Sequence, residues 1–286
     1  MIADARTIIG YALAESVRKR VFVVVLALTI AFVILYGVGV NFAYSEIDDS
    51  FFSGEALIDE QALVGGTIFG LGLFAVLFLG SVLAIFLTNG IVRGDAELGL
   101  LQPLVVRPLG RGTMLVARYL GAVTATTVYV VVVFTTLALL TAAAGDWTPN
   151  HLPEAAALLV AAVAVIAALS VLASVFLASS AQGIAVFMLF GAGLVGGLLG
   201  QIGDALSSRS LARVGDVVAT GLPFEALYQG ALHLIATDAS GVTRVVIELG
   251  PFGGSDEVGA GVIAFTGAYV LVVLTLAVRA FGRRDL

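Results

Sequence analysis

Long stretches without a charged residue dominate this sequence of 286 residues. A helix needs about 20 apolar residues to cross about 30 Å of hydrocarbon. Four uncharged runs are long enough for one span each, and a fifth, between Glu154 and Asp204, is far too long for one. Small polar residues at 179–183 interrupt this fifth run, and we interpret it as two helices joined by a tight turn there. The sequence therefore predicts an all-α membrane protein with a single domain, residues 1–286, and spans at about 21–40, 62–92, 114–144, 155–178, 183–203 and 258–279.

The composition agrees with a chain embedded in lipid. Only 12% of the residues are charged and 60% are hydrophobic, whereas soluble domains carry about 25% charged residues. So little polar surface cannot solvate a globule of this size, and lipid must replace water around most of the chain. The chain has 0 cysteines, which excludes a disulfide framework and a thiolate metal site.

The basic residues predict which side of the membrane each connection faces, because Lys and Arg near span ends mark the cytoplasmic side. With both termini inside, the outside loops hold only Arg209, Arg213 and Arg244 of the 14 basic residues. A five-span arrangement would place Arg283 and Arg284 outside, so six spans fit better. We expect a multi-pass protein of a prokaryotic cytoplasmic membrane, with both termini in the cytoplasm.

Two segments outside the spans carry helical patterns. Apolar residues before the first span recur near helical spacing, which predicts an amphipathic helix along the cytoplasmic interface. These residues are Ile2, Ile9, Leu13 and Val17. The extracytoplasmic segment 204–257 carries short helical patterns near 211–218 and 224–235 and a β-like run at 242–249. We expect short extracytoplasmic helices before the last span, forming a small cap or a re-entrant hairpin.

The motifs of the common catalytic sites are missing from the sequence. The lone lysine, Lys19, does not belong to a GxxxxGK[ST] phosphate loop, so the chain cannot be a P-loop ATPase by itself. The two histidines, His151 and His233, lie outside the predicted spans. The span centres lack the ionisable residues that proton-coupled carriers usually need. We therefore expect no catalytic residue, cofactor or metal in this chain, no nucleic-acid partner, and energy supplied by another subunit.

Glu225, Gln229 and His233 share one face of a predicted helix, at spacings of four residues. A metal site there is unfavourable, because Glu225 and His233 would lie two turns apart, about 12 Å along the axis. We interpret the three residues as a solvated polar face, and the sequence leaves any further role open.

Glycines in the second and fifth predicted spans match GxxxG, a spacing that lets helix backbones approach closely in lipid. In the fifth span the motifs are Gly193/Gly197 and Gly196/Gly200. Packing within the chain and a seam between two copies both fit this spacing, and the pattern alone does not decide between them.

The cytoplasmic segment between the second and third spans, residues 93–121, mixes charge with more apolar surface than a bare connector should show to water. Its apolar residues include Leu98, Leu100, Leu101, Leu104, Val105 and Val106. Exposed apolar patches rimmed by charge usually mark a docking site. The alternative is an interfacial helix that lies on lipid.

This segment resembles the signature of the exporter-type (type two) permeases of the ATP-binding-cassette (ABC) superfamily. The family pattern runs E-x-G-T-L, then P-(V/I)-S-R, then K-Y-L-G. The corresponding stretches here are ELGLL at 97–101, PLGR at 108–111 and RYLG at 118–121. Leu100, Gly110 and Arg118 replace the usual Thr, Ser and Lys, and the charge pattern is kept. The stretch ESVRKR at 15–20 and the terminal RRDL also resemble family motifs.

In that family, the segment after the second span includes a coupling helix that seats in a groove of a soluble ATPase. The resemblance implies that Glu97 and Arg111 are the polar anchors of a docking segment, residues 97–111, and that Leu100 and Leu101 form its apolar wedge. Gly99, Arg107 and Pro108 complete the implied ATPase-coupling set.

The family works as two permeases with two ATPases, and the ATPases bind ATP and Mg. The resemblance therefore implies a homodimeric exporter permease with no cofactor of its own. Spans one, two and five would contribute to the substrate path, which favours a dimer-facing position for the fifth-span glycines, Gly193, Gly196, Gly197 and Gly200. Two alternatives stay open: an ATPase-linked permease that assists maturation of a periplasmic metalloenzyme, and a stand-alone intramembrane enzyme. The residues do not indicate the substrate.

Overall fold

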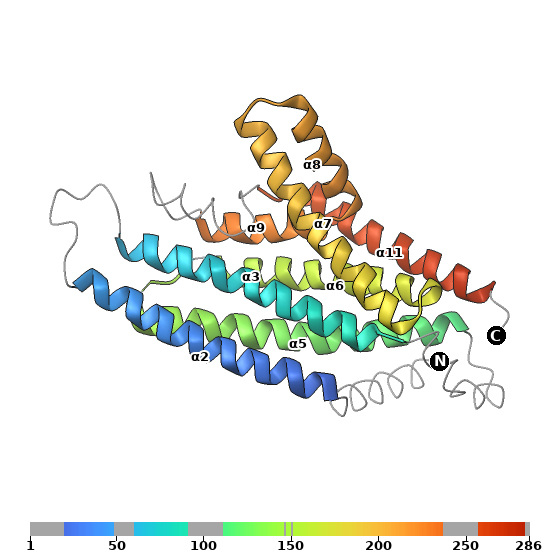
Figure 1. Ribbon diagram of the computed structural model, residues 1–286, viewed down its shortest axis with the longest axis horizontal. Coiled ribbons are helices and arrows are strands. Elements are labelled where there is room, and N and C mark those ends of the chain that lie inside the picture. The colour runs from blue at the N-terminus through green and yellow to red at the C-terminus, as the bar shows by residue number, and fades with distance from the viewer. Residues whose placement is uncertain are drawn as a thin grey trace.

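The computed structural model describes residues 20–48, 60–90, 111–145, 147–149, 151–236 and 257–283, and within these ranges every regular element is an α-helix. Six helices are long and apolar enough to span a membrane (Figure 1). They are α2 (Arg20–Asp48), α3 (Glu60–Thr88), α5 (Arg111–Gly145), α6 (Leu152–Phe176), α7 (Ser179–Ala205) and α11 (Ala260–Gly282). The predictions of an all-α fold and of six spans are confirmed.

Several helices extend beyond the uncharged runs that predict them. The sequence ends the first span near residue 40, whereas α2 continues to Asp48. It starts the third span near residue 114, whereas α5 begins at Arg111. A helix satisfies its own backbone hydrogen bonds in water as well as in lipid. The first charged residue therefore marks the limit of the lipid-facing part and not the end of the helix.

The turn between the fourth and fifth spans lies earlier in the chain than predicted. α6 ends at Phe176, Leu177 has an extended backbone (φ −110°, ψ 150°), and α7 begins at Ser179. The polar residues at 179–183 therefore open α7 instead of forming the turn. Gln182, the polar residue that suggests a turn, does not face solvent, because it is 0% exposed. Its side chain contacts other helices instead.

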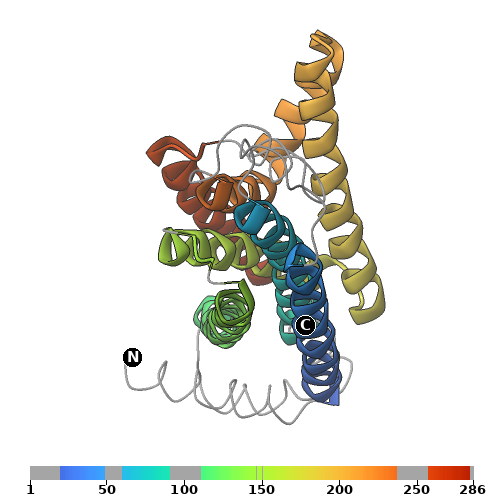
Figure 2. The same cartoon turned by 90° about the vertical axis from the view of Figure 1, so that its left-hand side faces the viewer.

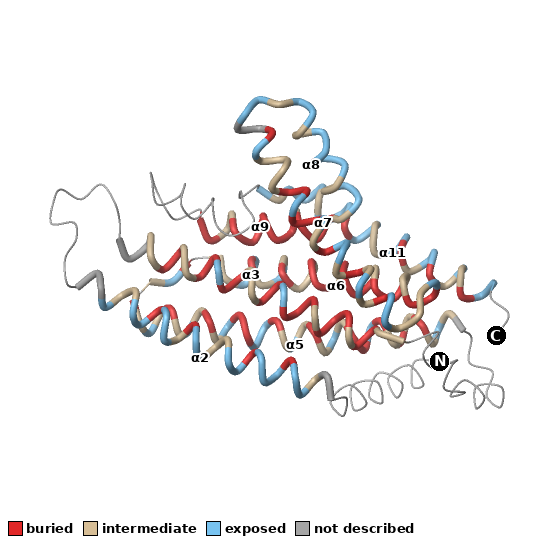
Figure 3. The backbone as a smooth tube through the Cα atoms, viewed as in Figure 1, coloured by how far each residue is buried: buried red, intermediate tan, exposed pale blue. Residues whose placement is uncertain are grey.

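α3 and α6 form the centre of the bundle. Their most apolar stretches are 67% buried, against 22% for α2 and 17% for α11, and Figure 3 shows the buried residues gathered along the central helices. α2 and α11 remain apolar on their outward faces, where Leu35 is 70% and Leu271 67% exposed. An apolar surface of this extent fits lipid as the surrounding solvent.

The chain leaves the bundle and returns to it after α7. α8 (Arg209–Gly221) folds back along the last turns of α7, and the α7–α8 hairpin stands out from the other helices (Figure 2). α9 (Phe224–Ala236) then packs on α6, α3 and α7, and most of its residues are buried. α8 and α9 lie where the sequence shows its two short helical patterns.

The first span begins and the last span ends at the same end of the bundle (Figure 1), as an even number of spans requires.

Three predictions lie outside the described residues. They concern the interfacial helix before α2, the β-like run at 242–249, and most of the docking segment.

Candidate functional site

α3 ends and α5 begins at the end of the bundle where α2 begins (Figure 1), and the docking segment lies between these two helices in the sequence. Most of the predicted coupling residues lie outside the described ranges: Glu97, Gly99, Leu100, Leu101, Arg107 and Pro108. Arg111 is the first residue of α5. The structure describes the two flanks of the segment, which are the end of α3 up to Gly90 and the first turns of α5. These flanks and the side chains that hold them form the candidate site.

The flank on α3 is held by the side chain of Gln182, in the first turn of α7. Gln182 Nε2 donates to the backbone O of Thr88 (3.0 Å), and Gln182 Oε1 accepts from the backbone N–H of Gly90 (3.1 Å). The same Nε2 lies 3.0 Å from both the backbone O and the Oγ of Ser170 in α6. The Thr88 hydroxyl donates to Ser170 Oγ (2.7 Å). Because Gln182, Thr88 and Ser170 are each 0% exposed, this polar junction joins three helices away from solvent.

The polar junction satisfies backbone groups where α3 ends. The last carbonyls of a helix have no partner within the helix, and an unpaired backbone group in hydrocarbon is costly. Gly90 has a φ of 71°, the left-handed conformation that glycine adopts after a helix C-terminus without a Cβ clash. The Gln182 amide donates to the carbonyl of Thr88 and accepts from the N–H of Gly90, so it pairs two backbone groups at the end of α3. Beside it, Asn89 Oδ1 is buried and has no hydrogen-bond partner among the described residues.

The flank on α5 is held mainly by close packing. A Cβ added at Gly112 would lie 2.8 Å from Cγ1 of Val278, so α5 and α11 touch closely there. Further along α5, the Tyr119 hydroxyl donates to the backbone O of Ala164 in α6 (3.2 Å). Both flanks of the docking segment therefore rest on α6, α3 through Ser170 and α5 through Ala164.

The four fifth-span glycines lie against α8 and α9 of the same chain. A Cβ added at any of them would meet a neighbouring residue of those helices. The pairs are Gly193 with the Phe224 ring, Gly196 with Val218, Gly197 with the Glu225 carboxylate, and Gly200 with the backbone of Gly215. We call this set the glycine junction. That these glycines also face a second copy of the chain stays a prediction.

Two of the three residues on the polar face of α9 are buried, so the prediction of a solvated face is wrong for Glu225 and Gln229, whereas His233 is partly exposed. Glu225 and Gln229 are each 3% exposed, and Gln229 Nε2 donates to Glu225 Oε1. Burial follows from the fold, because α9 packs into the bundle and Gly197 leaves room for the Glu225 carboxylate. Burial, and then the charge of Glu225, raise the pKa of the Tyr228 phenol above its usual value. No group of three or more His, Cys, Asp or Glu side chains gathers within the described part of the chain.

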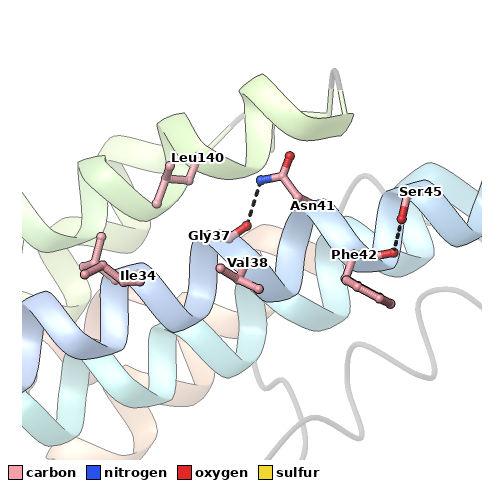
Figure 4. A pocket seen from close by; sticks show the side chains of 8 residues that line it. Ile34, Gly37, Val38, Asn41, Phe42, Ser45 and Leu140 are labelled. Atoms are coloured by element: carbon pink, nitrogen blue, oxygen red, sulfur yellow. Dashed lines mark hydrogen bonds between the residues drawn. The ribbon is translucent and has the colours of Figure 1, made fainter.

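An open groove of about 820 Å³ follows α2 beside α5 (Figure 4). Most of its lining is apolar, and two of its polar groups already bond their own helix. Asn41 Nδ2 donates to the backbone O of Gly37 (2.7 Å), and Ser45 Oγ donates to that of Phe42 (2.8 Å). The remaining lining residues are Val33, Ile34, Val38 and Leu140. Such a surface can hold an apolar chain and places no charged residue against it.

The sequence reading missed Gln182 as a site residue. The signal was its position inside the long uncharged run, where a polar side chain at membrane depth is costly unless it has a partner. That run also contains Gln201, whose Nε2 is buried with no hydrogen-bond partner among the described residues. Only the placement of α3 and α6 distinguishes the two glutamines.

Six apolar helices, with the buried pair α3 and α6 at their centre, define a multi-pass membrane protein. The family model described as ABC-2 family transporter protein matches residues 6–286, and the chain belongs to this family. The prediction of an ABC transport permease is therefore confirmed. No curated protein matches the chain.

Proposed function

We propose that the chain is the membrane-spanning subunit of an ATP-driven exporter and that a separate soluble ATPase docks on residues 97–111. The family match over residues 6–286 carries this proposal, because permeases of this family work with an ATPase partner. The sequence supports it, since the lone lysine, Lys19, rules out a P-loop in this chain and leaves ATP hydrolysis to another subunit.

The complex that we propose contains two copies of this chain and two ATPases in the cytoplasmic membrane. ATP and Mg bind to the ATPases alone. The docking segment is suited to receive their movement, because both of its flanks rest on the central helix α6. The apolar groove on α2 offers a surface for an amphiphilic or lipid-like substrate.

Binding of an ABC ATPase encoded beside this chain's gene tests the proposal. Replacing both polar anchors, Glu97→Ala with Arg111→Ala, should weaken binding of that ATPase by about 30-fold, because truncating one partner of a buried charged contact costs about 2 kcal/mol or more. The measurement is a binding titration of the purified ATPase against the permease in nanodiscs, with the thermal stability of the permease alone as the folding check.

The matched control removes one acidic and one basic residue from α8, Arg209→Ala with Asp216→Ala. Both side chains are exposed and lie on the α7–α8 hairpin, away from the docking segment. This control should bind the ATPase like the unmodified chain. Unchanged binding and unchanged ATP-coupled transport in the Glu97/Arg111 variant would overturn the docking assignment. A chain that binds no ATPase at all would overturn the proposed function.

A further inference from the structure

The described end of α3, up to Gly90, is hydrogen-bonded to the fifth span by the side chain of Gln182. Within three residues, Thr88 accepts from the Gln182 amide and Gly90 donates to it. A contact that uses both a donor and an acceptor of one planar amide fixes orientation as well as distance. The end of α3 therefore cannot turn or slide past the start of α7 without breaking both hydrogen bonds.

Breaking this contact is costly because of where it lies. Gln182, Thr88 and Ser170 are each 0% exposed, so water does not replace a hydrogen bond that is lost. A buried donor or acceptor left unpaired carries its full desolvation penalty. A displacement of the α3 end is therefore passed on to α7, because moving the two helices together preserves the hydrogen bonds.

α7 has close contacts to pass such a displacement onward. Its 27 residues form a helix about 40 Å long. At its far end, the glycine junction brings the backbone of α7 against the backbone of α8 at Gly200 and Gly215 and against α9 at Gly197. Contacts at this separation leave little space in which one helix can move without displacing the other.

We propose that Gln182 is a positioning residue that transmits movement of the docking segment to α7 and so to the α7–α8 hairpin. This inference rests on the proposed function, because it takes the ATPase as the source of the movement. Gln182 touches neither nucleotide nor ATPase in this scheme and acts through Thr88 and Gly90. A positioning role can be distinguished from a purely structural one. If Gln182 transmits movement, its substitution should abolish most of the response to nucleotide while the complex remains assembled.

The test is a labelling experiment at the far end of α7. The chain has 0 cysteines, so Leu206→Cys, at a position that is 69% exposed, introduces a unique thiol on this chain. The permease–ATPase complex is reconstituted in vesicles, and the maleimide labelling rate of that thiol is measured without nucleotide and after trapping with ATP and vanadate. The trapped state should change the labelling rate in the otherwise unmodified complex.

Gln182→Leu should reduce this nucleotide-dependent change by about tenfold, within the range usual for coupling between two sites. Its affinity for the ATPase should be unchanged. Gln201→Leu is the matched control, because it makes the same substitution on the same helix where the amide nitrogen has no partner among the described residues. That control should keep the full response. If Gln182→Leu does not fold, Gln182→Glu replaces it, since the carboxylate still accepts from Gly90 and lacks the amide hydrogens for Thr88 and Ser170.

The outcomes separate this inference from the proposed function. A full labelling response in a folded Gln182 variant that binds the ATPase would overturn the inference and leave the proposed function intact. Loss of ATPase binding in that variant would also overturn it, because Gln182 would then only shape the docking surface. An otherwise unmodified complex with no nucleotide response, or a chain that binds no ATPase, would overturn the proposed function itself.

Discussion

The first turn of α7 is held by hydrogen bonds, whereas its last turns are held by close approach of backbones. At the polar junction, one glutamine amide makes directional contacts with α3 and α6. At the glycine junction, missing side chains let α8 and α9 contact α7 over several turns. Lipid tails supply no hydrophobic drive between helices, so association depends on polar contacts or on tight packing. This chain uses each means at a different end of one helix.

The difference matters for how each junction responds to change. Hydrogen bonds of the polar junction depend on a few atoms and can be lost one at a time. The glycine junction depends on the distances from α7 to α8 and α9, which an added side chain increases where its neighbours are backbone atoms, as at Gly215. We therefore expect an added side chain at the glycine junction to lower stability more than the loss of one hydroxyl at the polar junction.

The largest loss is expected for Gly215→Leu. A Cβ at Gly215 would meet the backbone of Gly200 and of Gly196, and backbone cannot rotate away. Overpacking of this kind costs about 1–3 kcal/mol. The measurement is thermal unfolding of the purified chain in detergent, with the fraction of protein that stays monodisperse as the readout. The midpoint of this unfolding curve should fall by several degrees. Gly191→Leu is the control, because nothing lies within 4 Å of its Cβ position, and equal losses in the two variants would contradict the backbone contact.

A smaller loss is expected for Gly197→Ala. The atoms nearest its added Cβ belong to the carboxylate of Glu225, which is the end of a flexible side chain. Gly215→Ala, whose neighbours are backbone atoms, should therefore be less stable than Gly197→Ala. A double-mutant cycle with Glu225→Ala should give a coupling of about 0.5–3 kcal/mol. Additive effects in that cycle would show that Glu225 does not limit the space at Gly197.

The smallest loss is expected for Ser170→Ala at the polar junction. Gln182 keeps its contacts with the backbone of Thr88, Gly90 and Ser170, so only the contacts of one hydroxyl are lost. Side-chain hydrogen bonds between membrane helices average about 0.6 kcal/mol. Ser174→Ala serves as its control, because among the described residues the Ser174 hydroxyl donates to the backbone O of Val171 in its own helix and to no other helix. A loss for Ser170→Ala larger than that for Gly215→Leu would reverse the ranking of the two junctions.

The sequence predicts the number of spans well, and the residue-level contacts poorly. The turn after α6 shows the reason. Small polar residues at 179–183 look like a turn, but Gln182 is polar because it binds the end of α3, 94 residues away along the chain. Likewise, Glu225 and Gln229 follow the spacing of a solvated helix face and are buried, because α9 packs into the bundle and Gly197 of another helix leaves room for the Glu225 carboxylate. Each error concerns a polar side chain that is buried by helices distant in sequence.

The sequence by itself determined the class of the protein and its layout of spans. An uncharged run of about 20 residues has one stable way to exist in lipid, a helix that satisfies its own backbone. The family match over residues 6–286 agrees with the motifs at 97–121. The tertiary structure alone decided which faces meet. α3 and α6 are apolar around their whole circumference, so no periodicity marks the side that meets a neighbour. Only the placement of the helices brought Gln182 to Thr88 and Gly90, and the glycines of α7 to α8 and α9.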